Sequence, residues 1–382
     1  MKKLTFIIYC TLWLSCCIAC SAKEDKNTFV FKGRIGGMGR QMHLVYVDSS
    51  GKYAHCNIAL DNEQFHVEFK LPEPQVVEVN CRRLMKMVGN GFVPCNSGSL
   101  LFVAIPGQTL EVNGDLKKDF VDLYPGGDAE NDIFREYTSQ MHPIENESVN
   151  LMITNWTDST LTTEEKAANL QKMERLENEM QRIRMDFLQK YVSSVGGLWL
   201  LEDMLQRTQL TMEEAERFFS IADKKYEKLT YYKNIATRIQ GAKATEVGQL
   251  VPTIKTSRTY DGKPFDLAEY KGKYVLIDFW GTWCGACISG MPQMKKFAEK
   301  HADKLVLLGI AKDNRETWEE YLSKSEWNWK QIVAGEGEED YVVRFNVQGF
   351  PTKILIGPDG KILKRTVGED PAFYEELEHL MK

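Results

Sequence analysis

The sequence lacks several features that would indicate particular classes of protein. Its 382 residues contain no long run of Lys or Arg and carry a net charge of −6. Nucleic acid is therefore not expected as a partner, because phosphate binding needs clustered basic side chains. No second long hydrophobic stretch follows the N-terminal one, so the rest of the chain is not expected to cross a membrane. Internal repeats and low-complexity tracts are also absent, and the length then suggests two or three ordinary domains.

The N-terminus differs in kind from the rest of the chain. Two lysines, Lys2 and Lys3, precede an apolar stretch that extends from Leu4 to Leu14. A short basic segment followed by about 7–15 apolar residues is typical of an export signal and is too short to span a bilayer. Residues 1–19 are therefore predicted to be a signal peptide, and we expect an exported protein.

The end of this signal carries a candidate site of lipid attachment. The run Ile18-Ala19-Cys20-Ser21 resembles the lipobox of bacterial lipoproteins, whose signal is cut before a cysteine that receives lipid. The resemblance implies lipidation at Cys20, with residues 20–28 as a polar tether that holds the protein to a membrane of the cell envelope, facing the periplasm. Cys16 or Cys17 is an alternative lipid site, and a plain secretory signal is the alternative to lipidation.

Residues 29–125 predict a small antiparallel β domain. Short segments rich in β-branched and aromatic residues, such as 28–33 and 64–69, alternate with turn signals, and no helical pattern separates them. Strands at such close spacing are typical of a sandwich or barrel. The segment 101–112 resembles the end of an uncharacterised β domain found in bacterial lipoproteins.

Residues 126–245 change to a helical pattern. The charged stretch from Thr162 to Tyr191 has apolar residues at helical spacing, namely Leu170, Met173, Leu176, Met180, Ile183 and Phe187. Thr211 and Glu214 have the spacing of a capping box, which predicts a further helix start. We expect the apolar stripes to face a core or to pack helix against helix, and a surface that binds a protein partner is the alternative.

Five of the nine cysteines lie beyond the predicted tether. In an oxidising compartment Cys56, Cys81 and Cys95 allow one structural bridge with one thiol left over, and buried free thiols are the alternative. The other two, Cys284 and Cys287, are three residues apart and carry the clearest functional signal in the chain.

Residues 246–382 alternate predicted strands with predicted helices. Apolar segments at 273–279, 304–310 and 352–356 predict buried strands, with helical patterns between them. Pro358-Asp359-Gly360 predicts the turn of a hairpin, after which a final helix follows. This order of elements predicts an α/β domain of three layers.

The Cys284-Gly285-Ala286-Cys287 motif lies where a strand is predicted to give way to a helix. The first thiol then lies at the helix N-terminus, where unpaired N–H groups and the helix dipole favour thiolate over thiol. Since the thiolate is the nucleophile, Cys284 is predicted to attack a disulfide, and the more shielded Cys287 to resolve the mixed disulfide. No second Cys-x-x-Cys pair supplies ligands for zinc, so neither a metal nor a cofactor is expected.

Two motifs then carry a resemblance to a known family. The run Asp278-Phe-Trp-Gly-Thr-Trp-Cys-Gly-Ala-Cys287 is similar to the active site of thioredoxin and, more closely, to that of membrane-tethered TlpA/ResA-type proteins. Downstream, Gly349-Phe350-Pro351-Thr352 resembles the cis-proline loop of the same family. The resemblance covers roughly residues 249–382. It implies a thioredoxin fold in which a cis Pro351 faces the disulfide and shapes the substrate groove.

The resemblance also implies roles for the residues around the pair. Asp278 takes the place of the family's buried acid, and a carboxylate in an apolar strand is expected to have a raised pKa, which suits proton exchange with Cys287. An Asp exposed at a sheet edge is the alternative. Thioredoxin pairs this acid with a lysine, but by sequence spacing Gly309 stands at that place. Four residues are expected to contact substrate, namely Trp283, Gly285, Ala286 and Phe350.

These features together predict a lipid-anchored thiol–disulfide oxidoreductase of the cell envelope. The resemblance favours a reductant of disulfides in exported proteins that is itself re-reduced by a membrane electron donor. A disulfide isomerase or a peroxide-defence (antioxidant) protein is the alternative on the same fold. A third interpretation makes the first 245 residues a binding module for an envelope protein, with redox chemistry secondary.

Overall fold

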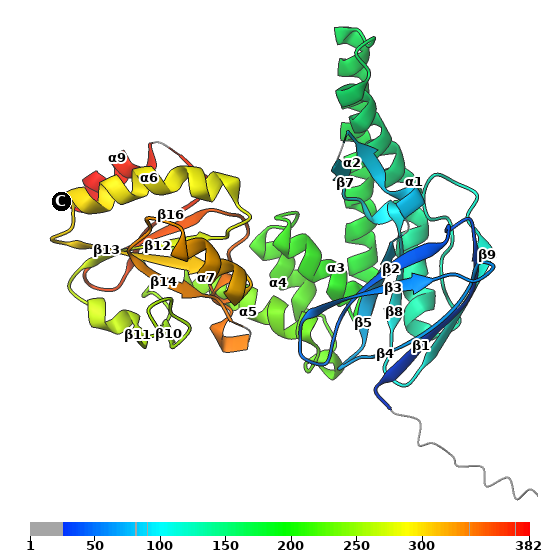
Figure 1. Cartoon of the computed structure of the whole chain (residues 1–382), viewed down its shortest axis with the longest axis horizontal. Coiled ribbons are helices and arrows are strands. Elements are labelled where there is room, and N and C mark those ends of the chain that lie inside the picture. The colour runs from blue at the N-terminus through cyan, green and yellow to red at the C-terminus, as the bar shows by residue number, and fades with distance from the viewer. Residues whose placement is uncertain (1–25, 81, 90, 336, 371) are drawn as a thin grey trace, which may run out of the picture.

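The computed structural model describes residues 26–80, 82–89, 91–335, 337–370 and 372–382. A β-rich part, a helical part and an α/β part follow one another along the chain (Figure 1). The predicted signal peptide at 1–19 and the predicted lipidation site Cys20 lie outside the described residues. Within the described ranges, no helix combines the length and the apolar character that crossing a bilayer requires.

The N-terminal part contains two sheets and a small hairpin. The three-stranded sheet consists of β4 (Gln64–Lys70), β1 (Thr28–Gly36) and β9 (Thr109–Asp115). The four-stranded sheet consists of β3 (Tyr53–Ala59), β2 (Gln41–Val47), β5 (Gln75–Asn80) and β8 (Ser99–Ala104). The hairpin consists of β6 (Lys86–Val88) and β7 (Gly91–Val93).

The β-rich character of this part agrees with the prediction, but the purely antiparallel arrangement was wrong for one pair of strands. The two sheets share a core in which Phe31 of β1 stacks on Phe102 of β8, with ring centroids 4.7 Å apart. Within its own sheet, β1 runs antiparallel to β4 and parallel to β9. Only strands joined by a short turn have to be antiparallel, and many residues separate β1 from β9.

The helical part begins with two long helices and continues with three shorter ones: α1 (Ala129–Thr157), α2 (Thr163–Tyr191), α3 (Val195–Gln206), α4 (Met212–Ser220) and α5 (Thr230–Ala244). The predicted capping box of Thr211 and Glu214 is confirmed at the start of α4. Thr162 and Glu165 form a second one at the start of α2. In each box the threonine hydroxyl accepts a hydrogen bond from the glutamate N–H, which satisfies a donor that the helix itself leaves unpaired.

The helices α1 and α2 form a hairpin whose far end projects beyond the rest of the molecule (Figure 1). Near its base, Met180, Ile183 and Phe187 are buried against α1 and α3, as predicted for a core-facing stripe. Leu170, in the projecting half, is 59% exposed, so the prediction was wrong there. The apolar stripe of α2 therefore extends further along the hairpin than the core that α1, α2 and α3 share.

The C-terminal part is a five-stranded sheet of order β14-β13-β12-β15-β16. The strands are β12 (Tyr274–Trp280), β13 (Leu305–Ala311), β14 (Lys330–Val333), β15 (Thr352–Ile356) and β16 (Ile362–Val367). The helices are α6 (Gly285–Lys300), α7 (Arg315–Ser323), α8 (Tyr341–Arg344) and α9 (Phe373–Leu380). A short pair, β10 (Lys255–Thr256) and β11 (Phe265–Asp266), precedes the sheet.

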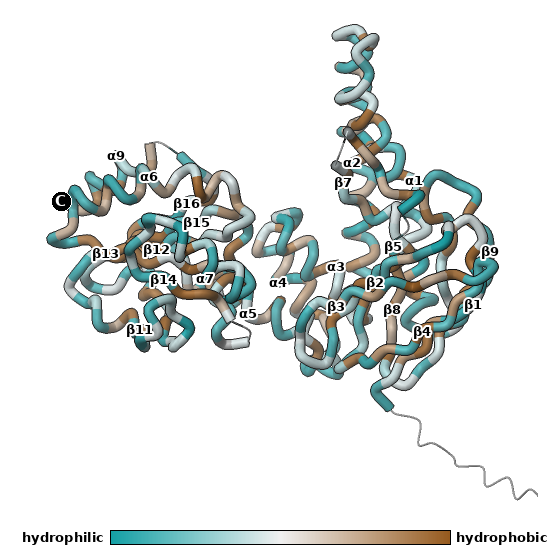
Figure 2. The backbone as a smooth tube through the Cα atoms, in the orientation of Figure 1, coloured by the Kyte–Doolittle hydropathy of each residue, from teal (hydrophilic) through white to brown (hydrophobic). Residues whose placement is uncertain are grey.

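Alternation along β12 determines which side chains face the active-site helix. Leu276 and Trp280 pack with residues of α6 and α9, whereas Ile277 and Phe279 pack with residues of α8 on the other face. Because side chains of a strand alternate between its faces, Asp278 lies on the α6 side. Hydrophobic residues accordingly follow the central strands, whereas hydrophilic residues recur along α6 and α9 (Figure 2).

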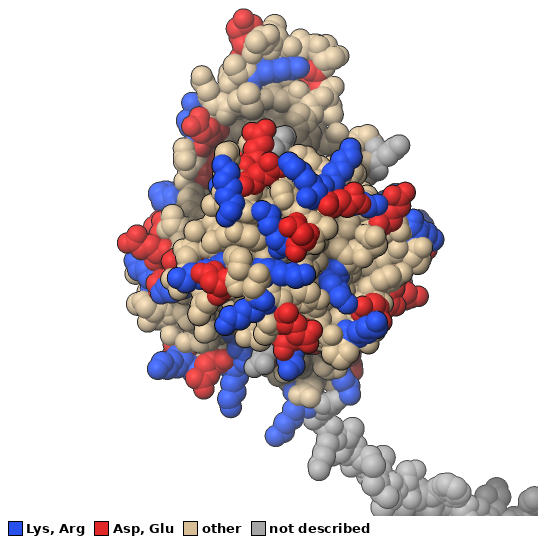
Figure 3. Space-filling model, turned by 90° about the vertical axis from the view of Figure 1, so that its left-hand side faces the viewer, with Lys and Arg blue, Asp and Glu red and all other residues tan. Residues whose placement is uncertain are grey.

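The C-terminal and helical parts meet where α5 packs on α8. There the Arg238 guanidinium donates a hydrogen bond to the Val347 carbonyl (3.4 Å), and the Gln348 amide donates one to the Leu205 carbonyl (3.3 Å). These contacts fix the segment that leads to Pro351. On the face of the C-terminal part turned away from the helices, basic and acidic side chains are interspersed (Figure 3).

Candidate active site

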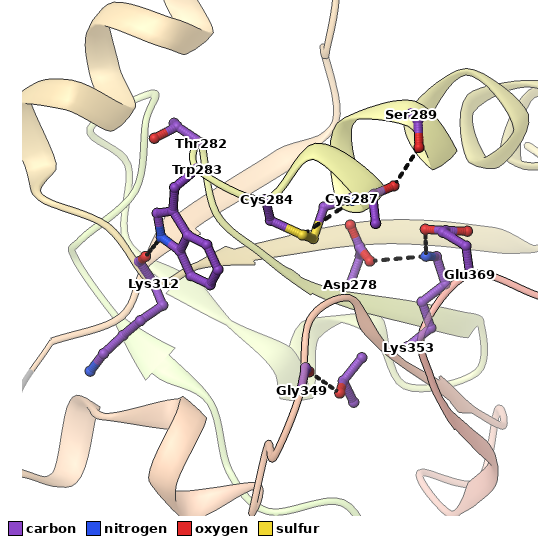
Figure 4. Close-up of a disulfide and its surroundings, with 12 residues drawn as sticks. Asp278, Thr282, Trp283, Cys284, Cys287, Ser289, Lys312, Gly349, Lys353 and Glu369 are labelled. Atoms are coloured by element: carbon purple, nitrogen blue, oxygen red, sulfur yellow. Dashed lines mark hydrogen bonds and ion pairs between the residues drawn. A yellow bond between two sulfur atoms is a disulfide. The ribbon is translucent and has the colours of Figure 1, made fainter. Parts of the chain in front are cut away.

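Cys284 and Cys287 form a disulfide at the start of α6, with their Cα atoms 5.3 Å apart (Figure 4). Cys284 is the N-cap residue of this helix, and its Sγ accepts a hydrogen bond from the Cys287 N–H (3.2 Å). Cys284 is 7% exposed and Cys287 only 1%. Cys284 is therefore the more accessible of the two residues, and Cys287 is the more shielded.

The loop that carries Cys284 is tied to the end of the neighbouring parallel strand β13. The N–H and the hydroxyl of Thr282 both donate to the Asp313 carboxylate, at 2.6 and 3.0 Å. The Trp283 indole N–H donates to the Lys312 carbonyl (3.0 Å), although the side chain as a whole is 61% exposed. Three hydrogen bonds thus hold the first cysteine in place and leave an indole face open to a substrate.

The predicted cis-proline loop lies beside this indole. The peptide bond between Phe350 and Pro351 is cis, as expected. The Phe350 ring meets the Trp283 ring edge-on, with centroids 5.1 Å apart. Between the two cysteines, Gly285 and Ala286 are exposed, and a Cβ added at Gly285 would meet no atom within 4 Å. The residues expected to contact substrate therefore form an open rim around Cys284.

Asp278 is buried behind the disulfide, with 2% of its surface exposed (Figure 4). Burial raises the pKa of this carboxyl to about 6; the Lys353 ammonium acts in the opposite direction, and the Glu369 carboxylate adds to the rise. The expected rise is thus confirmed, and the alternative of an exposed edge residue is excluded. A carboxyl with this pKa can accept and return a proton near neutral pH.

Two charged residues beside Asp278, Lys353 and Glu369, were not predicted from the sequence. Lys353 Nζ lies 3.5 Å from Asp278 Oδ1 and 2.5 Å from Glu369 Oε1. Lys353 stands directly opposite Asp278 in the antiparallel pairing of β12 with β15, so the lysine that Gly309 does not supply comes from the other neighbouring strand. One signal was present in the sequence: a lysine inside an apolar strand needs a buried partner.

Neither Cys56 nor Cys95 takes part in this disulfide. Cys56 and Cys95 are free thiols, and Cys81 lies outside the described residues. Among the residues that the structure describes, no group of three or more His, Cys, Asp or Glu side chains is arranged to hold a metal ion.

The comparisons with known proteins each match about a third of the chain. A Redoxin family model matches residues 246–379. The thiol-disulfide oxidoreductase ResA of Bacillus thuringiensis subsp. konkukian is 33% identical over 140 residues, which are 36% of this chain and 78% of the relative. The thioredoxin-like protein YneN of Bacillus subtilis is 30% identical over 126 residues, which are 32% of this chain and 71% of the relative.

Among solved structures, the thioredoxin domain of a thiol-disulfide oxidoreductase from Bacteroides vulgatus is similar to 36% of this chain. The similarity includes 99% of that domain, with 27% identity and a TM-score of 0.33. Because the ResA relative matches over 78% of its own length at 33% identity, the sequence comparison decides the family. The chain belongs to the thioredoxin-like thiol–disulfide oxidoreductases of the ResA type.

Proposed function

We propose that this protein reduces disulfide bonds in exported proteins by dithiol–disulfide exchange through Cys284 and Cys287. The observation that carries the proposal is the unequal exposure of the two cysteine residues, 7% for Cys284 against 1% for Cys287, at the N-terminus of α6. The helix N-terminus favours the thiolate of the accessible cysteine, and the shielded cysteine is close enough to resolve a mixed disulfide.

In the proposed cycle, the Cys284 thiolate attacks one sulfur of a substrate disulfide, and the other substrate sulfur leaves as a thiolate that takes up a proton from solvent. Cys287 then gives its proton to Asp278 and attacks Cys284 Sγ. This step closes the disulfide of the protein and releases the second substrate sulfur, which is also protonated. The substrate has gained two electrons and two protons. A dithiol donor at the membrane restores the reduced protein by the reverse exchange.

The rim around Cys284 suits a polypeptide substrate better than a small oxidant. Trp283 and Phe350 offer apolar ring surfaces next to the reactive sulfur, and Gly285 leaves the approach unobstructed. Aromatic side chains contribute strongly to binding at protein interfaces. A protein disulfide flanked by apolar residues is therefore the substrate class that this surface favours over a peroxide.

The export signal predicted at residues 1–19 and the lipid site at Cys20 support an envelope location with a lipid anchor. The cellular membrane would then supply both the anchor and the electron donor. The resemblance to the TlpA/ResA type favours reduction over oxidation, and the ResA relative is named a thiol-disulfide oxidoreductase.

The test uses two matched serine variants and a peptide that contains one disulfide. Cys287→Ser should accumulate a mixed disulfide with the peptide, because Cys284 attacks and nothing resolves the product. Cys284→Ser should form no mixed disulfide and should reduce no peptide. A Cys284→Ser protein that keeps the wild-type rate would contradict the proposal, and faster turnover with peroxide than with the peptide would favour the peroxide-defence alternative.

A second candidate function, binding of a protein chain by the N-terminal parts, rests on one observation. The projecting hairpin of α1 and α2 carries two large exposed apolar side chains, Trp156 (64%) and Leu170 (59%). Replacing both with Ser should raise the KM for an unfolded protein substrate and leave the reduction of a small disulfide unchanged. Equal KM values for variant and wild type would exclude this role for the hairpin.

A further inference from the structure

Three ionisable side chains form a buried cluster behind the disulfide. The side chains of Asp278 and Lys353 are 3% and 2% exposed, and that of Glu369 is 25% exposed. With both carboxyls ionised the cluster has a net charge of −1, and one bound proton makes it neutral. Because burial penalises net charge, the cluster favours the uptake of one proton.

The geometry determines which carboxyl takes that proton. Lys353 Nζ lies 2.5 Å from Glu369 Oε1 and donates a hydrogen bond to it, but lies 3.5 Å from Asp278 Oδ1. Asp278 Oδ1 is buried and accepts no hydrogen bond. Glu369 therefore holds the ammonium group, and Asp278 keeps an oxygen atom that can receive a proton.

The fold provides a specific place for Glu369. A Cβ added at Gly290, in the second turn of the active-site helix, would lie 2.2 Å from Glu369 Oε1, so the carboxylate packs where only a glycine leaves room. The preceding residue, Gly368, has a φ of +85° and donates its N–H to the Pro351 carbonyl (2.8 Å). Glu369 is thereby anchored both to α6 and to the cis-proline loop.

Few other groups act on Asp278. The electrostatic influences on its carboxyl come from Lys353 of β15 and from Glu369, which follows β16. From α9, Tyr374 contributes a buried hydroxyl without a hydrogen-bond partner, and burial raises its pKa, so it stays neutral. On the α6 side, Cys284 and Cys287 lie near Asp278 and are joined in the disulfide (Figure 4).

We propose that Glu369 is a positioning residue: it holds Lys353 away from a full ion pair with Asp278 and so leaves Asp278 able to exchange a proton with Cys287. The inference rests on the proposed exchange through the two cysteines and adds a residue to it. During resolution, the proton moves from Cys287 Sγ to Asp278 as the S–S bond to Cys284 forms and the substrate sulfur leaves. Reduction by the donor returns that proton to Cys287.

The experiment isolates the resolving step in the full-length protein. Reduced protein is mixed with Ellman's disulfide, which releases one thionitrobenzoate when Cys284 attacks and a second when Cys287 resolves. In the wild type, the rate of the second phase should fall as the pH falls through about 6, where Asp278 becomes protonated. Three variants are compared over this range: Glu369→Gln, Lys353→Met and a control, Glu376→Gln.

The two cluster variants should change the pH profile in opposite directions. In Glu369→Gln, the freed ammonium stabilises the Asp278 carboxylate, so the midpoint should move to lower pH by about one unit. In Lys353→Met that ammonium is lost, and the midpoint should move to higher pH. Glu376 forms a comparable pair with Lys364 (2.6 Å) at the surface, and Glu376→Gln should keep the wild-type profile.

Several outcomes separate this inference from the proposed function. If both cluster variants keep the wild-type midpoint, or move it in the same direction, Glu369 has only a structural role and the inference is wrong. Loss of stability alone lowers the amount of active protein but does not displace a midpoint. If the wild type shows no second phase, or if Cys287→Ser retains it, the exchange mechanism itself fails.

Discussion

Replacing Asp278 by Asn should make the oxidised protein more stable at neutral pH. The pKa of this buried carboxyl is raised from 3.8 to about 6, so between these values the folded protein binds more protons than the unfolded chain. The contribution of this carboxyl to the free energy of unfolding is then greatest at low pH, falls as the pH rises from about 4 to 6, and stays at the lower level above that range. Asn has the shape of the protonated acid and has no acidic proton to lose, so it stays uncharged at both pH values.

The magnitude follows from the difference between the two pKa values. One pKa unit corresponds to about 1.36 kcal/mol, so a difference of roughly two units gives about 3 kcal/mol in favour of Asp278→Asn at pH 7. At about pH 4 the advantage should nearly vanish, because the native carboxyl is then protonated as well. The pairing of Lys353 with Glu369 remains in the variant, so no unpaired ammonium offsets this gain.

Urea unfolding followed by tryptophan fluorescence provides the assay. Five of the eight tryptophans lie in the C-terminal part, namely Trp280, Trp283, Trp318, Trp327 and Trp329, so the signal reports mainly on the domain that contains Asp278. Variant and wild type are compared at about pH 4 and pH 7, and the difference between them is the quantity of interest. An Asp278→Asn protein that unfolds at the same or lower urea concentration than the wild type at pH 7 would refute the reasoning.

The remaining predictions concern the active-site helix, the substrate rim and the lipid anchor. Gly290→Ala should lower the free energy of unfolding by about 1–3 kcal/mol, since its Cβ would overlap the Glu369 carboxylate; thermal unfolding measures this, and an unchanged transition would contradict the close packing. Trp283→Ala should raise the KM for a peptide disulfide without slowing the reduction of Ellman's disulfide, and a loss of both rates would show a structural role instead. Cys20→Ala should abolish incorporation of labelled palmitate in bacterial cells; labelling that persists would direct attention to Cys16 or Cys17.

Much of the C-terminal fold could be predicted because its signals are local. The apolar segments at 273–279, 304–310 and 352–356 coincide within a residue or so with β12, β13 and β15. The hairpin at Pro358-Asp359-Gly360 joins β15 to β16, with Gly360 at a φ of +83° that favours glycine. The Cys284–Cys287 disulfide and the cis bond before Pro351 agree with the family motifs.

The features that could not be predicted depend on contacts between distant residues. Lys353 meets Asp278 only because β12 and β15 pair in one particular register, and Glu369 joins them only because Gly290 leaves room on α6. The parallel pairing of β1 with β9 likewise depends on how the chain between these two strands folds before β9 reaches the edge of β1. The exposure of Leu170 depends on how far the other helices extend along the hairpin.

The equilibrium reduction potential of the Cys284–Cys287 pair is the most direct test of the claim that this protein is a reductant. It can be measured by titrating the purified protein without its N-terminal signal against glutathione or dithiothreitol. A value near that of thioredoxin, about −270 mV, is predicted. A value near about −120 mV would make the protein an oxidant and would contradict the proposed direction of electron flow.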